Sequence, residues 1–92
     1  MKITSLTVSN SVGLHARPAA LFVGIAKSCQ STVQIRNVTK SGSWCNAKSI
    51  LAVLTLGVEK DHQIEIKAEG PDEELVIQSL IALVSSNFES AA

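Results

Sequence analysis

His15 is the residue of this chain best suited to chemistry, because it stands in the segment GLHARPAA, residues 13–20, where a loop turns into a helix. Pro18 is favoured in the first turn of a helix, since its missing N–H leaves no hydrogen bond unmade. His15 is therefore expected at or beside the N-cap, where the backbone N–H groups of Ala16 and Arg17 and the helix dipole form an anion site. The Arg17 guanidinium adds a fixed charge and a planar set of donors that suit phosphate. These residue types predict an imidazole that takes up a phosphoryl group.

Position alone does not establish this chemistry, because a lone histidine at a helix start is more often a surface residue or a helix cap with no chemical role. Neutral imidazole is nevertheless both a nucleophile and a good leaving group near neutral pH, so a phosphoryl group bound to it keeps a high transfer potential. The chain predicts no metal site and no cofactor, since Cys29 and Cys45 stand apart with no second pair to complete a zinc site. His62 is interpreted as a solvated residue of a turn.

Size and composition limit the remaining possibilities. The 92 residues, 46% of them hydrophobic, predict a single domain over residues 1–92 with one modest core. The formal net charge is zero, so nothing global attracts nucleic acid or an anionic membrane, and proteins are the expected partners. The chain begins with an alternating strand rather than a signal segment, and apolar runs such as residues 19–23 are too short for a membrane span. We therefore expect a cytoplasmic protein with no membrane insertion.

Hydrophobic periodicity predicts seven elements in the order βαββαβα. Gly57 is expected to end the second helix at the C′ position, and Pro71 to stand in the first turn of the third. Strands that are apolar on one face only imply one sheet covered by helices on one side and open to water on the other. The elements are expected at residues 4–8 (strand), 18–27 (helix), 33–35 (strand), 44–45 (short strand), 50–56 (helix), 64–68 (strand) and 71–88 (helix).

The water-facing side of this sheet is expected to be polar and free of aromatic side chains. An RNA-binding sheet needs aromatic rings on which bases stack, so nucleic acid is excluded as an expected partner. The predicted open face carries Gln34, Arg36, Gln63, Glu65 and Lys67.

Two motifs, GLHARPAA at residues 13–20 and NAKSIL at residues 46–51, resemble those of HPr, the histidine-containing phosphocarrier of the bacterial phosphoenolpyruvate-dependent sugar phosphotransferase system. The resemblance runs from about Leu6 to about Phe88. It implies an α+β open-faced β-sandwich, with a four-stranded antiparallel sheet in the order 1-4-2-3 and three helices on one face. It also implies a carrier rather than an enzyme: His15 accepts a phosphoryl group from phosphorylated enzyme I and donates it to sugar-specific enzyme II A-type domains. The resemblance assigns the phosphate to Nδ1, which the residues themselves do not distinguish from Nε2.

Ser49 precedes an apolar helical run and is predicted to be a helix N-cap. It also matches the regulatory serine of HPr proteins from organisms with an HPr kinase/phosphorylase, and in some relatives the phosphoserine form recruits a transcriptional regulator. A phosphate there would place charge in an apolar docking surface, so we hypothesise weaker binding to enzyme I without unfolding.

The resemblance to HPr implies that the first and second helices combine into a partly apolar surface around His15 that docks partner proteins. On the first helix, the side opposite the buried stripe carries small and apolar residues, and the short second helix cannot turn all its apolar residues inward. Gly24 occupies a position that is often basic in HPr proteins. A docking surface of modest size suits the weak, fast-exchanging complexes of a monomeric carrier. The expected docking surface comprises Ala20, Leu21, Gly24, Lys27, Ile50, Leu51 and Leu54.

Three interpretations remain open at this point. The first is a phosphocarrier that uses His15. The second is a regulatory relative, of a nitrogen-type or catabolite-control branch, in which Ser49 and the apolar surface matter most. The third is an unrelated small interaction module. Retention of His15, Arg17 and Pro18 favours the first over the second, since a purely regulatory protein could dispense with the histidine.

Overall fold

The computed structural model describes residues 1–89 and has the predicted order of elements, βαββαβα. The four strands form one antiparallel sheet in the order β1-β4-β2-β3, which confirms the expected topology. The elements are β1 (Lys2–Thr7), α1 (Ala16–Lys27), β2 (Thr32–Asn37), β3 (Cys45–Asn46), α2 (Ile50–Thr55), β4 (Gln63–Glu69) and α3 (Glu73–Ser85).

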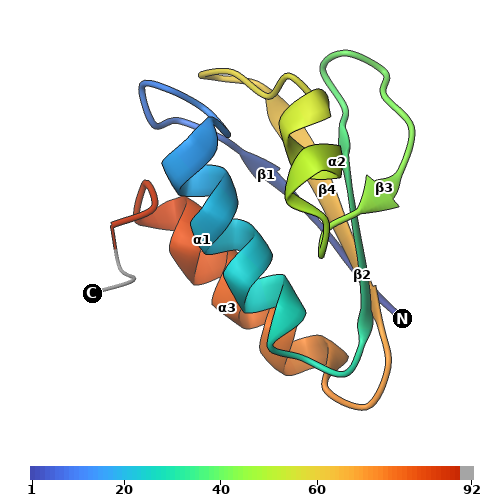
Figure 1. Cartoon of the computed structure of the whole chain (residues 1–92). Coiled ribbons are helices and arrows are strands. Elements are labelled where there is room, and N and C mark those ends of the chain that lie inside the picture. The colour runs from blue at the N-terminus through green and yellow to red at the C-terminus, as the bar shows by residue number, and fades with distance from the viewer. Residues whose placement is uncertain (90–92) are drawn as a thin grey trace.

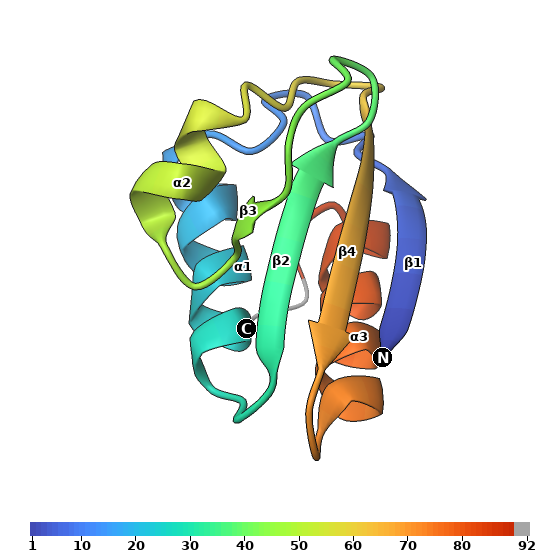
Figure 2. The same cartoon turned by 90° about the vertical axis from the view of Figure 1, so that its right-hand side faces the viewer.

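All three helices lie on the same side of the sheet. Figure 1 shows α1 and α3 side by side across this face, with the shorter α2 packed against α1 and β3. Figure 2 shows the strands in front and the helices behind. No element within the described residues covers the face of the sheet that points away from the helices. The open-faced α+β sandwich is thus confirmed. No helix within residues 1–89 has the length and apolarity needed to cross a membrane.

Alternation along the strands places the core between the sheet and the helices. Val33 and Ile35 of β2 and Ile64 and Ile66 of β4 are all buried, whereas their neighbours in sequence are more exposed. Helix α1 contributes a stripe with helical spacing, because residues three and four apart share one face. That stripe consists of Pro18, Ala19, Phe22, Val23 and Ala26.

Helix α3 differs in two respects from the expectation. Pro71 stands outside the helix, because Asp72 occupies the N-cap position and Glu73 is the first helical residue. The helix ends at Ser85, three residues before the expected end, and it buries Val76, Ile77, Leu80, Leu83 and Val84. Phe88, expected as the last residue of the helix, is buried but follows the helix in a left-handed backbone conformation with φ +64°. The chain reversal after Ser85, rather than helical periodicity, brings its ring into the core.

The Asp72 carboxylate links the start of α3 to the connection between α1 and β2. It accepts hydrogen bonds from the backbone N–H groups of Gln30 and Ser31, each at 3.0 Å, and from the hydroxyl of the buried Ser31. The Ser31 hydroxyl and the Gln30 N–H favour the charged form and lower the pKa of Asp72. This contact holds together segments that are far apart in sequence.

The open face of the sheet contains an aromatic ring, contrary to the expectation. Trp44 precedes β3, and its ring lies 4.3 Å from Lys67 Nζ and 5.4 Å from the guanidinium carbon of Arg36, measured to the ring centroid. Arg36 also pairs with Glu65, with 2.6 Å between Nε and Oε1. Trp44 is expected at the start of a short strand, and the antiparallel pairing of that strand, β3, with β2 places its ring beside Arg36 and Lys67.

Candidate functional site

His15 occupies the N-cap of α1, as the sequence predicted. Its backbone is extended, with φ −81° and ψ −169°, and its carbonyl accepts the first helical hydrogen bond from the N–H of Ala19 at 2.8 Å. Its side chain is exposed and makes no capping hydrogen bond. The imidazole therefore stands at the helix start with both ring nitrogens free of partners among residues 1–89.

The first turn of α1 offers unused hydrogen-bond donors next to this ring. The backbone N–H groups of Ala16 and Arg17 bond to no described residue. Residue 18 is proline and has no N–H to offer. No acidic side chain of the first turn competes for the two donors. Because the first N–H groups of a helix lack intrahelical acceptors and carry its positive dipole end, an anion beside His15 would meet two aligned donors.

Two hydrogen bonds, one between loops and one within the loop before α1, hold the segment next to His15 in place. The N–H of the buried Leu14 donates to the carbonyl of Val58 at 3.0 Å, and the Asn10 side-chain amide donates to the carbonyl of Gly13 at 2.9 Å. Gly13 has φ +63°, and a Cβ there would stand 2.3 Å from Val58 O and 2.7 Å from Glu59 Cα. Only glycine fits both the left-handed conformation and this close approach.

A hollow of about 230 Å³ opens at the His15 side of this junction. It brings together the loop before α1 and the segment after α2, as well as Leu54 of α2. Gly57 has φ +62° and follows the C-cap Leu56, so it ends α2 at the predicted C′ position. The hollow is lined by Leu14, His15, Ala16, Leu54, Gly57, Val58 and Glu59.

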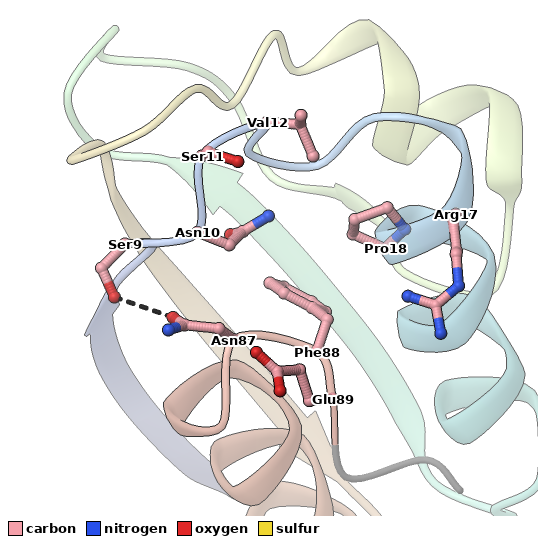
Figure 3. Close-up of a pocket in the computed structure, with 9 residues that line it drawn as sticks. All are labelled: Ser9, Asn10, Ser11, Val12, Arg17, Pro18, Asn87, Phe88 and Glu89. Atoms are coloured by element: carbon pink, nitrogen blue, oxygen red, sulfur yellow. Dashed lines mark hydrogen bonds between the residues drawn. The ribbon is translucent and has the colours of Figure 1, made fainter.

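Arg17 lines a different hollow, of about 360 Å³, between the start of α1 and the segment after α3. Figure 3 shows its guanidinium beside Pro18, with Phe88 and Glu89 across the hollow and a hydrogen bond between Ser9 and Asn87 at its far side. Arg17 is exposed and forms no ion pair with a residue of the described range. The structure therefore does not bring the guanidinium into the His15 hollow, although the two residues are near neighbours in sequence.

The apolar residues expected around His15 are exposed on α1 and α2. Ile50, Leu51 and Leu54 have exposed fractions of 38%, 73% and 39%. On α1, Ala20, Gly24 and Lys27 are exposed, whereas Leu21 is half-buried and packs against the core. Helices α1 and α2 lie against each other, and Leu54 of α2 lines the same hollow as His15.

Ser49 is the N-cap of α2, as predicted. Its hydroxyl oxygen accepts a hydrogen bond from the N–H of Ala52 at 3.2 Å, and its backbone is extended. The side chain is half-buried and directly precedes Ile50 in the apolar surface.

His62 is not the solvated turn residue that the sequence suggested. Its Nδ1 atom lies 3.1 Å from the side-chain nitrogen of Asn37 and accepts a hydrogen bond from the Glu59 N–H, also at 3.1 Å. The sequence analysis overlooked Asn37, which is fully buried and also donates to the Leu56 carbonyl at 3.1 Å. A polar residue at an inward position of β2 was the available signal. These contacts support the loop that carries Val58 and Glu59.

Fold and site together define a small α+β domain that presents an exposed histidine at the start of its first helix. The sequence matches the family model described as PTS HPr component phosphorylation site over residues 3–86. The chain thus belongs to the HPr family, the phosphocarrier proteins of the phosphotransferase system.

Relatives of three kinds match this chain. It is 37% identical to the phosphocarrier protein HPr of Mycoplasma pneumoniae over 95% of this chain and 97% of that protein. It is 35% identical to the phosphocarrier protein NPr of Escherichia coli K12 over 92% of each. It is also 45% identical to a multiphosphoryl transfer protein of Vibrio cholerae over 88% of this chain, but it spans only 20% of that protein's length.

The structural comparison agrees with the sequence match. The crystal structure of HPr-C-His from Thermoanaerobacter tengcongensis superimposes with a TM-score of 0.91 at 39% identity, covering 100% of both chains. The interpretation as an unrelated interaction module is therefore wrong.

Proposed function

We propose that His15 is the phosphoryl acceptor of this carrier, which receives the group from phosphorylated enzyme I and donates it to enzyme II A-type domains. The observation that carries the proposal is the unbonded, exposed imidazole at the N-cap beside the free N–H groups of Ala16 and Arg17. Phosphoryl transfer needs mainly positioning and charge stabilisation, which aligned amides supply without a metal. Exposed side chains exchange rotamers within nanoseconds, so the unpaired Arg17 guanidinium can swing toward a phosphate on His15.

Labelling with phosphoenolpyruvate and enzyme I tests this assignment. Native protein should gain one phosphate that is labile in acid and stable in alkali, and the His15→Ala variant should gain none. His62 is the second of the chain's 2 histidines and gives a matched control. In His62→Asn, the amide oxygen can take the place of the Nδ1 acceptor, so this variant should be labelled like the native protein. Labelling of His15→Ala, or none of the native protein under active enzyme I, would overturn the assignment.

The preferred phosphoryl donor and acceptor of this carrier show whether it works in the sugar branch or the nitrogen branch of the phosphotransferase system. Relatives from the HPr and NPr groups are about equally similar to it. We infer a sugar-branch carrier, since His15, Arg17 and the apolar docking surface are all present. Parallel labelling with sugar-type and nitrogen-type enzyme I should be faster with the former. Faster labelling by the nitrogen-type enzyme would contradict this inference and favour the interpretation of the protein as a regulatory relative.

The docking surface formed by Ala20, Leu21, Gly24, Lys27, Ile50, Leu51 and Leu54 is inferred to receive both donors and acceptors. Its apolar side chains on α2 stand beside the hollow of His15, since Leu54 belongs to both. A monomeric carrier keeps this surface free for each partner in turn. Sedimentation at working concentration should therefore give the monomer mass, and a dimer with this surface covered would contradict the inference.

We further infer that phosphorylation of Ser49, by a kinase of the HPr kinase/phosphorylase type, weakens docking to enzyme I. Ser49 adjoins Ile50 and Leu51, so a phosphate would bring about −1.5 to −2 charges to an apolar surface. At the N-terminus of α2 the same charge is tolerated by the helix dipole, and the fold should survive. Labelling of His15 should be slower in Ser49→Asp than in native protein. Ser49→Ala serves as the control that removes the hydroxyl without adding charge, and equal rates in Ser49→Asp and native protein would contradict the idea.

A further inference from the structure

Among the residues that line the His15 hollow, Glu59 is the one aspartate, glutamate, lysine or arginine. The other lining residues are apolar or glycine: Leu14, Ala16, Leu54, Gly57 and Val58. The Arg17 guanidinium lines the separate hollow near Phe88 and Glu89. A phosphoryl group on His15 would therefore lie in a hollow whose lining includes one acidic residue and no lysine or arginine.

The backbone of Glu59 is held against the loop that carries His15. Its Cα stands 2.7 Å from the position of a Cβ on Gly13, and the neighbouring Val58 carbonyl accepts from the N–H of Leu14. On the other side, the Glu59 N–H donates to His62 Nδ1, and the Glu59 carbonyl accepts from the His62 N–H at 3.0 Å. These contacts leave the residue little freedom to move away from His15.

The negative charge of Glu59 has no compensating partner. Its carboxylate forms no hydrogen bond or ion pair with any residue in the described range 1–89. Lys40 approaches the same region, with its Nζ 2.9 Å from the position of a Cβ on Gly57, but it forms no ion pair with Glu59. No direct ion pair within the described range therefore neutralises the Glu59 charge.

We propose that Glu59 tunes the carrier by repelling the phosphoryl group on His15, so that the group is held less tightly and passed on more readily. The proposal rests on His15 being the acceptor. In the forward step, the lone pair of an unprotonated His15 ring nitrogen forms a bond to phosphorus. The nitrogen–phosphorus bond in phosphorylated enzyme I breaks, and its electron pair returns to the imidazole of enzyme I. The phosphohistidine dianion that results shares with Glu59 the hollow that both residues line, and like charges repel, whereas the neutral, unmodified ring does not experience this repulsion.

The test measures how a labelled phosphoryl group partitions at equilibrium between enzyme I and the carrier. Glu59→Gln removes the charge and keeps the shape of the side chain. Glu69→Gln removes an equal charge from an exposed position at the opposite end of β4, about 20 Å along the sheet. Glu59→Asp restores the charge on a shorter side chain. Unfolding midpoints in urea should be equal for all four proteins, since neither glutamate side chain is buried.

Glu59→Gln should shift the partition toward phosphorylated carrier by about threefold at low salt, and this difference should shrink at 1 M salt, where charges are screened within about 3 Å. Glu59→Asp should behave like the native protein, and Glu69→Gln should leave the partition unchanged. A packing effect would not depend on salt in this way. If native protein and Glu59→Gln partition alike while both are labelled, the role of Glu59 is refuted and His15 remains the acceptor. If native protein takes no label, the assignment of His15 fails first and this inference falls with it.

Discussion

The side-chain nitrogen of Asn37 lies 3.1 Å from Nδ1 of His62, and this contact joins the end of β2 to the turn before β4. Asn37 is fully buried, donates to the Leu56 carbonyl and accepts from the Lys40 N–H at 3.3 Å. A single side chain thus satisfies groups from three separate segments around the loop that supports the His15 hollow.

Replacing Asn37 by alanine should destabilise the fold by about 2–3 kcal/mol, because buried hydrogen-bonding groups would lose their partner. Urea unfolding measures the change. Asn46→Ala is the matched control: Asn46 is exposed on β3, and its side chain accepts only from the Lys48 N–H at 2.9 Å. The control should lose less than about 1 kcal/mol. Equal losses of unfolding free energy in the two variants would show that the buried Asn37 contacts stabilise the fold no more than one exposed hydrogen bond does.

His62 should carry its proton on Nε2 when neutral, because Nδ1 accepts hydrogen bonds from both Asn37 and the Glu59 N–H. Nitrogen-15 spectra of the histidine rings at a pH where both are neutral report the tautomer directly. In Asn37→Ala the preference should weaken, since one donor is gone. A dominant Nδ1–H tautomer in the native protein would contradict the arrangement in which the Asn37 amide and the Glu59 N–H both donate to Nδ1.

Two glycines should respond to alanine in opposite ways. Gly13→Ala should lose about 2–4 kcal/mol, since a Cβ would meet Val58 O at 2.3 Å in a left-handed conformation. It should also slow labelling of His15, because the loop before α1 must shift.

Gly24 is exposed within α1, and a Cβ there meets nothing within 4 Å. Gly24→Ala should therefore raise the free energy of unfolding by about 0.5–1 kcal/mol. Urea unfolding and labelling rates on both variants check the pair, and a tolerated Gly13→Ala would contradict the close approach.

A charge on the proposed docking surface should slow phosphoryl transfer without unfolding the protein. Leu51 is 73% exposed on α2, and Leu75 is 68% exposed on α3, away from His15. Leu51→Arg should therefore reduce the rate of labelling by enzyme I at least about tenfold, by the loss of apolar contact at an interface centre. Leu75→Arg adds the same charge at a similarly exposed leucine and should leave the rate unchanged. A rate that falls equally in both variants would point to net charge rather than docking.

Stability should decline in acid as Asp72 becomes protonated. The Ser31 hydroxyl and the Gln30 N–H hold the pKa of Asp72 below its ordinary value of 3.8. A carboxylate with a depressed folded pKa contributes stability that is fully present above the unfolded pKa and is lost as the pH falls through the folded pKa. The difference in unfolding free energy between native protein and Asp72→Asn should be constant at and above about pH 5 and should shrink below about pH 4. A difference that stays constant down to pH 2 would argue against a charged Asp72 in these contacts.

Much of the fold was predictable because it depends on local rules. Alternating apolar residues fixed the inward faces of β2 and β4, and Gly57 marked the end of α2. The N-cap positions of His15 and Ser49 were likewise predictable, since both precede a run with helical spacing. The strand order came from the resemblance rather than from periodicity, because periodicity says nothing about which strands are neighbours.

Several side chains near the site could be placed only by the tertiary structure. The element types, the inward faces and an imidazole at a helix start could be predicted from the residues alone, since they follow from backbone hydrogen bonding and side-chain period within a few residues. The sequence by itself did not determine that His62 meets Asn37, that Trp44 covers Lys67, or that Glu59 rather than Arg17 shares the hollow of His15. Such contacts join segments distant in sequence, and they depend on how turns with positive φ and close backbone approaches, as at Gly13, bring the loops together.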